Sequence, residues 1–325
     1  MGLLIDGMWQ SADTRTAGAF VRADTAFRNW VTPDGAPGPT GEGGFPAEPG
    51  RYHLIVSLAC PWAHRTLIFR ALKQLDREIG LSVVNPFMGD QGWTFDPAPG
   101  VIAAPVPVAA LHQLYALADP TYTGRASVPV LWDLERGVIV SNESADVIRM
   151  LNSAFDHLGA APGDYYPAAR RAEIDALNHR IYATLNNGVY RAGFATTQQA
   201  YEDAVFPLFG TLDFLDAHLA NRRFLTGSAP TEADWRLFTT LVRFDPVYAT
   251  HFKCNLRRLV DYRTLWAYTR DLYQWPGIRE TVDFTHIKRH YFTSHPDINP
   301  HSIIPAGPLL DFDAPTLRAP GIMLA

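Results

Sequence analysis

The amino-acid sequence predicts an α/β domain followed by an all-α domain. Between residues 51 and 155, apolar runs follow one another in the order strand, helix, strand, and then strand, strand, helix. From about residue 165 to residue 325, apolar residues recur mostly at helical spacing. The first order is that of a thioredoxin-like domain. We therefore expect residues 51–155 to form such a domain and residues 165–325 to form a helical domain with an extended tail.

The composition is that of an ordinary globular protein, and the length is sufficient for two domains. The 325 residues are 47% hydrophobic and 19% charged. The net charge is −5 and no long basic run occurs, which argues against nucleic acid as a partner. Two cysteines argue against a disulfide-stapled secreted protein. With no signal-like start and no apolar run long enough to cross a bilayer, we expect a cytoplasmic protein without a membrane partner.

Residues 1–50 are expected to form an irregular arm. The stretch 33–50 is too rich in proline and glycine for a helix or a strand. Its glycine cluster, 41–44, lacks the Gly-Lys-Ser/Thr ending of a phosphate-binding loop, and no strand precedes it. We therefore expect a surface loop that folds over the active site.

The thioredoxin-like part contains six predicted elements. Strands are expected at 52–57, 81–84, 130–132 and 138–141, and helices at 63–75 and 143–151. Asn142 is the expected N-cap of the last helix. Pro129 directly precedes the third strand, where it ends the pairing or sits in a cis turn. A long insertion, 86–124, contains one helical stretch at 108–117.

The helical part contains five predicted helices, at 168–187, 197–220, 231–243, 255–274 and 276–283. Thr231 and Asp234 resemble a capping box that fixes the start of the third helix. From Phe292 onward, repeated prolines predict an extended tail over the surface.

Cys60 stands between a buried strand and a helix that begins with Pro61, a residue suited to the first helical position. Free N–H groups and the helix dipole favour an anion at such a place, so the thiol should ionise near neutral pH. The strand–Cys–Pro–helix context therefore favours a nucleophilic thiolate over a buried cysteine that only packs.

A second thiol is missing beside Cys60. A dithiol motif needs a cysteine three residues on, where Ala63 stands, and Cys254 is nearly two hundred residues away. A mixed disulfide on Cys60 must therefore be resolved by an outside thiol, for which glutathione is the obvious candidate.

Four side chains raise the alternative of a zinc site, namely His251, Cys254, His286 and His290. No second cysteine pair accompanies them, so we expect no metal. His64 lies beside Cys60, where a base is one interpretation, but we expect a histidine on the helix surface.

Seven further motifs are spread along nearly the whole chain. They lie at 18–30, 60–63 (Cys-Pro-Trp-Ala), 125–133, 142–146, 187–194, 243–248 and 299–308. A thioredoxin-like half followed by a helical half resembles the glutathione transferase architecture. With these motifs the chain resembles more closely the glutathionyl-hydroquinone reductases, or Xi-class glutathione transferases.

The resemblance implies a glutathione site. Cys60 matches the nucleophile, and Val128, before a cis Pro129, matches a residue that binds the cysteinyl backbone like an added strand. Glu143 and Ser144 match the pair that holds the γ-glutamyl group, at a helix start suited to a carboxylate. Further contacts implied are Trp93, Arg125, Ala126 and Ser127. Ala126 departs from the branched apolar residue expected there, which leaves its backbone contact intact.

Tyr190, Tyr248 and Tyr291 match the family's three active-site tyrosines. Tyrosine is common in protein cores, so each of them alone would be read as structural. The resemblance implies that Tyr190 donates a proton to the aromatic product. It implies that Tyr248 and Tyr291 hydrogen-bond the sulfur and favour its thiolate.

The activity implied is reduction of glutathionyl-hydroquinones by a ping-pong thiol transfer, with glutathione as co-substrate and no metal. Two alternatives remain at this stage. One is an omega-like thiol transferase or dehydroascorbate reductase, and the other is a non-enzymatic ligand-binding protein on the same fold. The resemblance also implies a homodimer.

Overall fold

A computed structural model describes residues 2–11, 15–16, 19–20, 24–316 and 318. The chain divides into two compact units. Unit 1 comprises Met1–Thr14, Ala23–Gly163 and Thr281–Ser294, and unit 2 comprises Arg15–Arg22, Asp164–Glu280 and His295–Ala325. Residues 281–294 therefore belong to unit 1, although the preceding part of that unit ends at Gly163, more than a hundred residues earlier in the chain.

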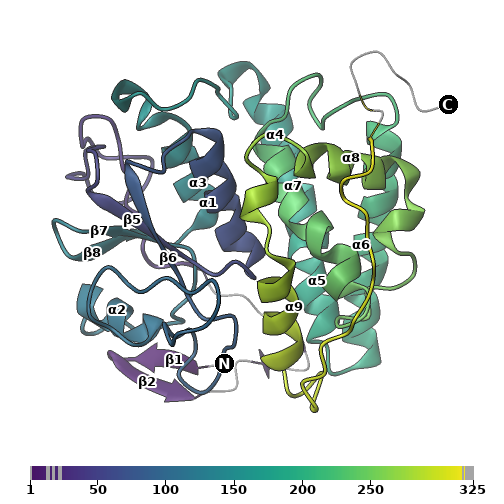
Figure 1. Ribbon diagram of the computed structural model, residues 1–325, viewed down its shortest axis with the longest axis horizontal. Helices are drawn as coiled ribbons and strands as arrows, with labels where there is room; N and C mark the ends of the chain where they lie inside the picture. Colours follow the sequence, from purple (N-terminus) through teal and green to yellow (C-terminus); the bar gives the residue numbers. More distant parts are fainter. Residues whose placement is uncertain (1, 12–14, 17–18, 21–23, 317, 319–325) are drawn as a thin grey trace. The chain divides into compact units, whose positions relative to one another are not determined.

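Unit 1 is built on a four-stranded mixed sheet with the order β6-β5-β7-β8 (Figure 1). The strands are β5 (Tyr52–Val56), β6 (Ile79–Val83), β7 (Val130–Asp133) and β8 (Val138–Ser141). β6 runs parallel to β5, while the pairs β5–β7 and β7–β8 are antiparallel. Leu54, Ile55 and Val56 of the central β5 are fully buried, as expected for a strand covered on both faces. The predicted thioredoxin-like order is confirmed.

Helices α1 (Pro61–Leu72) and α3 (Ser144–Ser153) pack against each other (Figure 1), and α2 (Leu111–Ala118) contacts β8. α1 begins at Pro61, two residues before the predicted start, because Cys60 is already the N-cap. α3 is capped by Glu143, whose Oε1 accepts the Ala145 N–H at 3.0 Å. The prediction that Asn142 caps this helix is wrong, because its side chain is engaged elsewhere.

The last helix, α9 (Phe284–Thr293), was missed in the sequence. The region 276–283 holds only a short 3-10 turn, Arg279–Thr281, so the helix predicted there is wrong. Asp283 is the N-cap of α9, since its carboxylate accepts the His286 N–H at 2.8 Å. The extended tail therefore begins after Thr293, slightly later than predicted.

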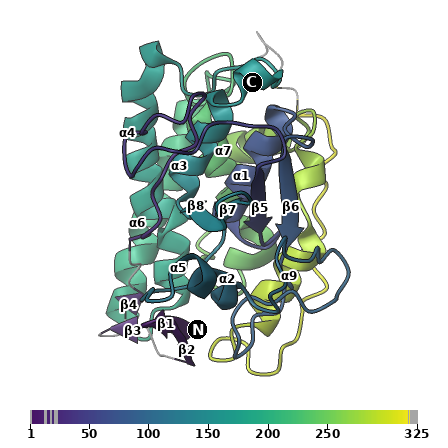
Figure 2. The ribbon, with the colours of Figure 1, turned by 90° about the vertical axis from the view of Figure 1, so that its left-hand side faces the viewer.

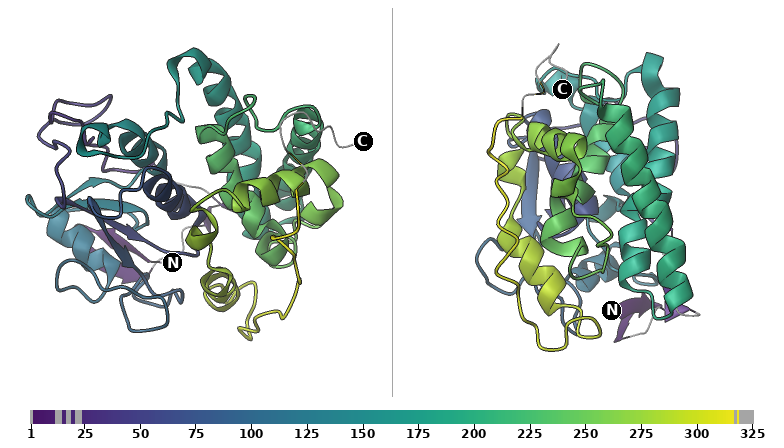
Figure 3. Two further views of the ribbon diagram at one scale, coloured as in Figure 1. Left: turned by 45° about the horizontal axis from the view of Figure 1, so that its top comes forward. Right: turned by 90° about the vertical axis from the view of Figure 1, so that its right-hand side faces the viewer.

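Unit 2 is mainly helical (Figure 3), with the short strands β3 (Arg15–Thr16) and β4 (Ala19–Phe20) as its only strands among the described residues. Its helices are α4 (Arg171–Ile181), α5 (Gly188–Gly193), α6 (Gln198–Leu219), α7 (Glu232–Arg243) and α8 (Arg263–Tyr273). The predicted capping box at the start of α7 is confirmed, with Asp234 Oδ2 accepting the Thr231 N–H at 2.8 Å. α8 starts eight residues later than predicted, because Leu259–Asp261 form a separate 3-10 turn in which the Asp245 carboxylate accepts the Leu259 and Val260 N–H groups.

The N-terminal arm is more ordered than expected. β1 (Gly2–Ile5) and β2 (Met8–Ser11) form an antiparallel hairpin that lies near α2 (Figure 2). Asp6 and Gly7, at its turn, both have positive φ, 46° and 73°. An Asp-Gly pair between short strands is a strong hairpin signal, so the prediction of a wholly irregular arm is wrong. Two short strands, β3 (Arg15–Thr16) and β4 (Ala19–Phe20), pair in the same way.

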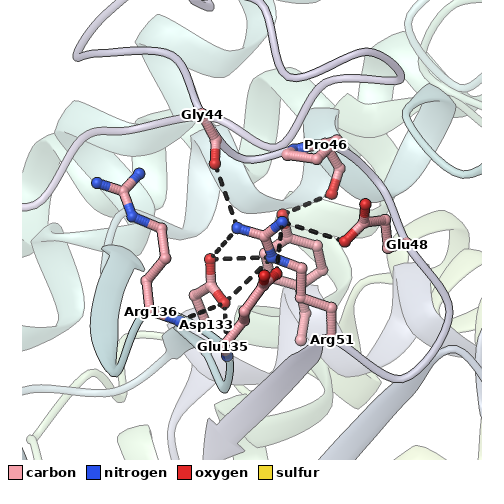
Figure 4. A network of polar contacts seen from close by, with 8 residues as sticks. Gly44, Pro46, Glu48, Arg51, Asp133, Glu135 and Arg136 are labelled. Atoms are coloured by element: carbon pink, nitrogen blue, oxygen red, sulfur yellow. Dashed lines mark hydrogen bonds and ion pairs between the residues drawn. The ribbon is translucent and has the colours of Figure 1, made fainter.

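The Pro/Gly-rich loop is fixed by the network around Arg51 (Figure 4). The Arg51 guanidinium donates to the buried Asp133 carboxylate at 2.7 Å and to Gly44 O at 3.2 Å. Tyr52, which lies opposite Asp133 in the β5–β7 ladder, is at the end of β5 away from Cys60. The expectation that the loop folds over the active site is therefore wrong for its second half, which is held at the opposite end of the sheet.

Candidate functional site

Cys60 is the N-cap of α1 and is half-buried. Its carbonyl accepts the His64 N–H at 2.9 Å, the first bond of the helix, while its own backbone is extended, with φ −76° and ψ 122°. The side chain therefore projects where the N–H groups of the first turn have no intrahelical acceptor. This is the setting that favours a thiolate.

A second chain segment meets the cysteine at its sulfur. Cys60 Sγ lies 3.7 Å from Val128 O, and the Val128–Pro129 peptide bond is cis, as predicted. Val128 is buried, whereas Arg125, Ala126 and Ser127 just before it are half-buried. The structure thus brings the predicted nucleophile next to the predicted backbone-binding segment.

Glu143 and Ser144 form the start of α3. Glu143 is half-buried, and its second oxygen, Oε2, accepts the Thr25 hydroxyl at 3.2 Å. Ser144 is buried, with its Oγ 3.4 Å from Arg65 Nη1. Glu143 therefore places a carboxylate at the N-terminus of α3, directly before Ser144 in the chain.

The arm segment 24–30 packs on this helix start. The Arg28 guanidinium forms an ion pair with Asp146 in the first turn of α3. Burial raises the pKa of Asp146, and the Arg28 charge opposes that shift. Thr25 and Arg28 were not predicted as site residues, although Arg28 belongs to one of the family motifs in the sequence. The motif drew attention to this segment, but only the fold shows that Thr25 contacts Glu143 and that Arg28 contacts Asp146.

Trp93 is buried in the insertion, and its ring stacks on His290 of α9 at 4.7 Å between centroids. His290 Nδ1 donates to Pro86 O at 3.0 Å, and His286 Nε2 donates to Pro99 O at 2.7 Å. Ser294 Oγ accepts the Met88 N–H at 3.0 Å. One face of α9 thus holds both ends of the loop 86–100 that carries Trp93.

The three predicted tyrosines fall in both units. Tyr291 lies in α9, in the same unit as Cys60, and is buried beside His290 with ring centroids 5.2 Å apart. Tyr190, in α5, and Tyr248 belong to unit 2, where their ring centroids are 6.2 Å apart. α5 follows the π-helical turn Tyr182–Asn186, and Tyr248 ends another, Phe244–Tyr248. Such turns occur frequently at functional sites.

Phe252 organises the two tyrosines of unit 2. Its ring centroid lies 5.6 Å from that of Tyr190 and 5.6 Å from that of Tyr248, and it is fully buried. A Cβ at Gly193 would lie only 2.1 Å from the Phe252 ring, so glycine is required for this approach. Phe252 lies outside the motifs that carry the family resemblance in the sequence.

The four side chains considered for a zinc site fall in different units, with His251 and Cys254 in unit 2 and His286 and His290 in unit 1. His286 and His290 use ring nitrogens to hold carbonyl oxygens, and His251 Nε2 hydrogen-bonds His295 Nδ1 at 3.0 Å. Cys254 is fully buried, and burial raises the pKa of its thiol to about 12. Within the described part of the chain, no group of three or more His, Cys, Asp or Glu side chains is placed to hold a metal ion.

His64 differs from the sequence expectation. It is fully buried, and its Nε2 hydrogen-bonds Thr281 Oγ1 at 2.8 Å. The expectation of a surface histidine is wrong, because α1 is covered here by the segment that leads into α9.

Comparison with known proteins identifies the family to which this chain belongs. Residues 59–154 match the family model "Glutathione S-transferase, N-terminal domain", and residues 198–271 match "Glutathione S-transferase, C-terminal domain". The chain is 59% identical to glutathionyl-hydroquinone reductase YqjG of Escherichia coli (strain K12), over 97% of this chain and 98% of that protein. The chain belongs to the glutathionyl-hydroquinone reductase family.

Other relatives match this chain over nearly the full length of both chains. Glutathionyl-hydroquinone reductase PcpF of Sphingobium chlorophenolicum is 52% identical, over 98% of this chain and 100% of that protein. The glutathione-bound structure of Escherichia coli K-12 YqjG superposes with a TM-score of 0.92 at 57% identity, covering 98% and 99% of the two chains. An Xi-class transferase of Natrialba magadii superposes with a TM-score of 0.92 at 48% identity, covering 98% and 97%.

The family's architecture is the one described above, a thioredoxin-like N-terminal domain and a helical C-terminal domain. Among the described residues, no helix is both long enough and apolar enough to cross a membrane.

Proposed function

We propose that this chain reduces glutathionyl-hydroquinones to hydroquinones and releases oxidised glutathione. The observation that carries the proposal is Cys60 at the start of α1, with Val128 O 3.7 Å from its sulfur, in a chain 59% identical to a glutathionyl-hydroquinone reductase. A single accessible thiol requires a second thiol from outside, and glutathione supplies it.

The reaction proceeds in two thiol-transfer steps. In the first, the Cys60 thiolate attacks the glutathionyl sulfur, a sulfur–sulfur bond forms, and the bond from that sulfur to the aromatic carbon breaks. The electron pair of the broken bond stays on the ring carbon, which takes a proton from Tyr190, and hydroquinone leaves. In the second, a glutathione thiolate attacks the mixed disulfide, so that oxidised glutathione leaves and the Cys60 thiolate returns.

Glutathione is held by residues of unit 1 in this proposal. The Val128 backbone takes the cysteinyl residue, and Glu143 and Ser144 take the γ-glutamyl ammonium and carboxylate at the start of α3. Arg125 serves as a carboxylate clamp, and Trp93, Ala126 and Ser127 complete the contacts. Tyr248 and Tyr291 act as donors to the sulfur. The half-buried state of Cys60, Glu143 and the segment 125–127 supports access for a ligand.

The test is intact-protein mass spectrometry after mixing the reduced protein with a glutathionyl-hydroquinone. Wild type should gain the mass of one glutathionyl group, located on Cys60 by peptide mapping, and Cys60→Ala should gain none. Addition of glutathione should remove the adduct. An unmodified Cys60 together with steady turnover would rule out the two-step route. Turnover of dehydroascorbate in preference to the hydroquinone conjugate would favour an omega-like activity.

Assembly and location follow the same proposal. We infer a cytoplasmic homodimer, consistent with a reduced Cys60 in a glutathione-rich compartment. Light scattering of the purified protein tests the oligomeric state, and a mass of one chain would contradict it.

A further inference from the structure

We propose that Tyr115 is a positioning residue of the glutathione site, where its hydroxyl fixes the spacing between the segment Ser127–Val128 and the start of α3. This inference rests on the proposed function and adds a residue to it. Tyr115 lies in α2, within the insertion, and belongs to none of the family motifs found in the sequence.

Ser127 and Asn142 occupy all the hydrogen-bonding positions of the Tyr115 hydroxyl. It donates to Ser127 O at 2.7 Å, and it accepts the Ser127 N–H at 3.3 Å and the Asn142 side-chain N–H at 3.0 Å. A phenol has one hydrogen to donate and two lone pairs to accept with, so these three bonds fill its capacity. Tyr115 is fully buried, which makes each bond costly to leave unmade.

The phenol is held as a donor. Burial raises the pKa of Tyr115, and the hydrogen bonds to Ser127 and Asn142 only partly oppose this, so the hydroxyl stays protonated at neutral pH. Its ring is fixed by Tyr122 and Phe27, whose centroids lie at 5.2 and 5.7 Å. The hydroxyl therefore has a defined position relative to β7 and β8.

The bridge begins where the sheet ends. The ladder between β7 and β8 extends to the pair Leu131–Ser141, and the two segments linked by Tyr115 lie just beyond it. One is Ser127–Val128, which touches Cys60, and the other is Asn142, directly before Glu143 and Ser144. These segments face the cysteinyl and γ-glutamyl parts of one tripeptide, so their spacing has to match the ligand.

Asn142 extends the same link to the arm. Its side-chain Oδ1 accepts the Phe27 N–H at 3.3 Å, and its backbone N–H donates to Phe27 O at 3.2 Å. Asn142 therefore stands between Tyr115 and the segment that carries Thr25 and Arg28. This explains why its side chain does not cap α3.

The experiment compares Tyr115→Phe with Tyr52→Phe. Each removes one buried phenol hydroxyl from unit 1, since Tyr52 donates to Pro46 O at 2.7 Å, at the end of β5 away from Cys60. Tyr115→Phe should raise the glutathione KM by about tenfold and leave kcat within about threefold, because a binding interaction is misplaced while the reacting atoms are not. Tyr52→Phe should lower Tm but leave KM unchanged.

Asn142→Ala provides a second route if Tyr115→Phe does not fold. It removes the other end of the bridge and should raise the same KM, and the double variant should be no worse than the weaker-binding single variant, because both remove one connection. An unchanged KM in Tyr115→Phe, or an equal rise in Tyr52→Phe, would overturn the proposal.

Calorimetric titration with glutathione separates this proposal from the proposed function. If wild type fails to turn over glutathionyl-hydroquinone, the function fails, while a weaker glutathione Kd in Tyr115→Phe than in Tyr52→Phe still supports the positioning role. Equal Kd values in these two variants count against Tyr115, whatever the activity.

Discussion

Cys60 and Cys254 differ in the surroundings that determine thiol reactivity. Cys60 is half-exposed at a helix start, whereas the Cys254 sulfur is buried against Phe252 O, at 3.7 Å. Burial raises the pKa of Cys254 to about 12, so at pH 8 only on the order of one molecule in ten thousand carries that thiolate.

The first prediction concerns these two thiols. Cys60→Ala should abolish turnover while preserving the fold, and Cys254→Ala should leave turnover within about twofold of wild type. Iodoacetamide at pH 8 should label wild type once, on Cys60, as read by peptide mapping. Labelling of Cys254 at a comparable rate would show that its burial does not protect it.

The second prediction concerns the helix start of α3. Glu143→Gln and Ser144→Ala should each raise the glutathione KM more than they lower kcat, since each removes a contact far from the reacting sulfur. A lost hydrogen bond to a charged group costs about 1.5–3 kcal/mol, which corresponds to roughly ten- to a hundredfold in KM. Asp76→Asn, on the exposed partner of Arg70, is the matched control and should leave KM as it was.

Sequence alone indicated candidate reactive residues more readily than the residues that hold them in position. Cys60 was predicted from its strand–Pro–helix setting, and the cis bond before Pro129 from the family resemblance. Tyr115 and Thr25 were missed, and His290 was considered only as a metal ligand, because each acts through a contact with a residue 12 or more positions away. No local pattern encodes such a contact.

At the scale of elements, local chemistry set the boundaries. β8 was predicted at the residues observed, because its apolar run is followed directly by the polar stretch that starts α3. α9 was missed because Asp283, its N-cap, was taken as the last residue of a helix at 276–283. The start of α8 was misjudged because Asp245, in another segment, holds Leu259 and Val260 outside the helix.

The third prediction tests how α9 holds the insertion loop. Ser294→Ala removes the acceptor of the Met88 N–H, so hydrogen exchange at the Met88 amide should accelerate by about tenfold. The Asn85 amide, bonded to Thr94 O within the loop, is the internal control and should keep its rate. Equal acceleration at both amides would indicate that the whole loop opens and that Ser294 has no specific role.

At the scale of the whole molecule, buried and half-buried histidines shape the response to acid. Burial lowers the pKa of His53, His112 and His251, and for His251 to about 4, with the Lys253 charge adding to the shift. A lowered folded-state pKa means that the unfolded chain binds the proton more readily. The stability from His251 is therefore complete above pH 6.5 and is lost as the pH falls toward 4.

The fourth prediction follows from that sign. The free energy of unfolding of wild type should fall relative to that of His251→Gln between pH 6.5 and 4, by at most about 3 kcal/mol. Urea unfolding of both proteins at several pH values measures the difference. Parallel curves across this window would mean that His251 is not held neutral by the fold.

The late position of α9 has a consequence for synthesis on the ribosome. Unit 1 takes its last segment, Thr281–Ser294, after all of residues 164–280 have been made. A nascent chain that has already produced the sheet, Cys60 and the start of α3 still lacks Tyr291 and the histidines that hold the Trp93 loop. The helix that holds the Trp93 loop is thus translated more than two hundred residues after Cys60.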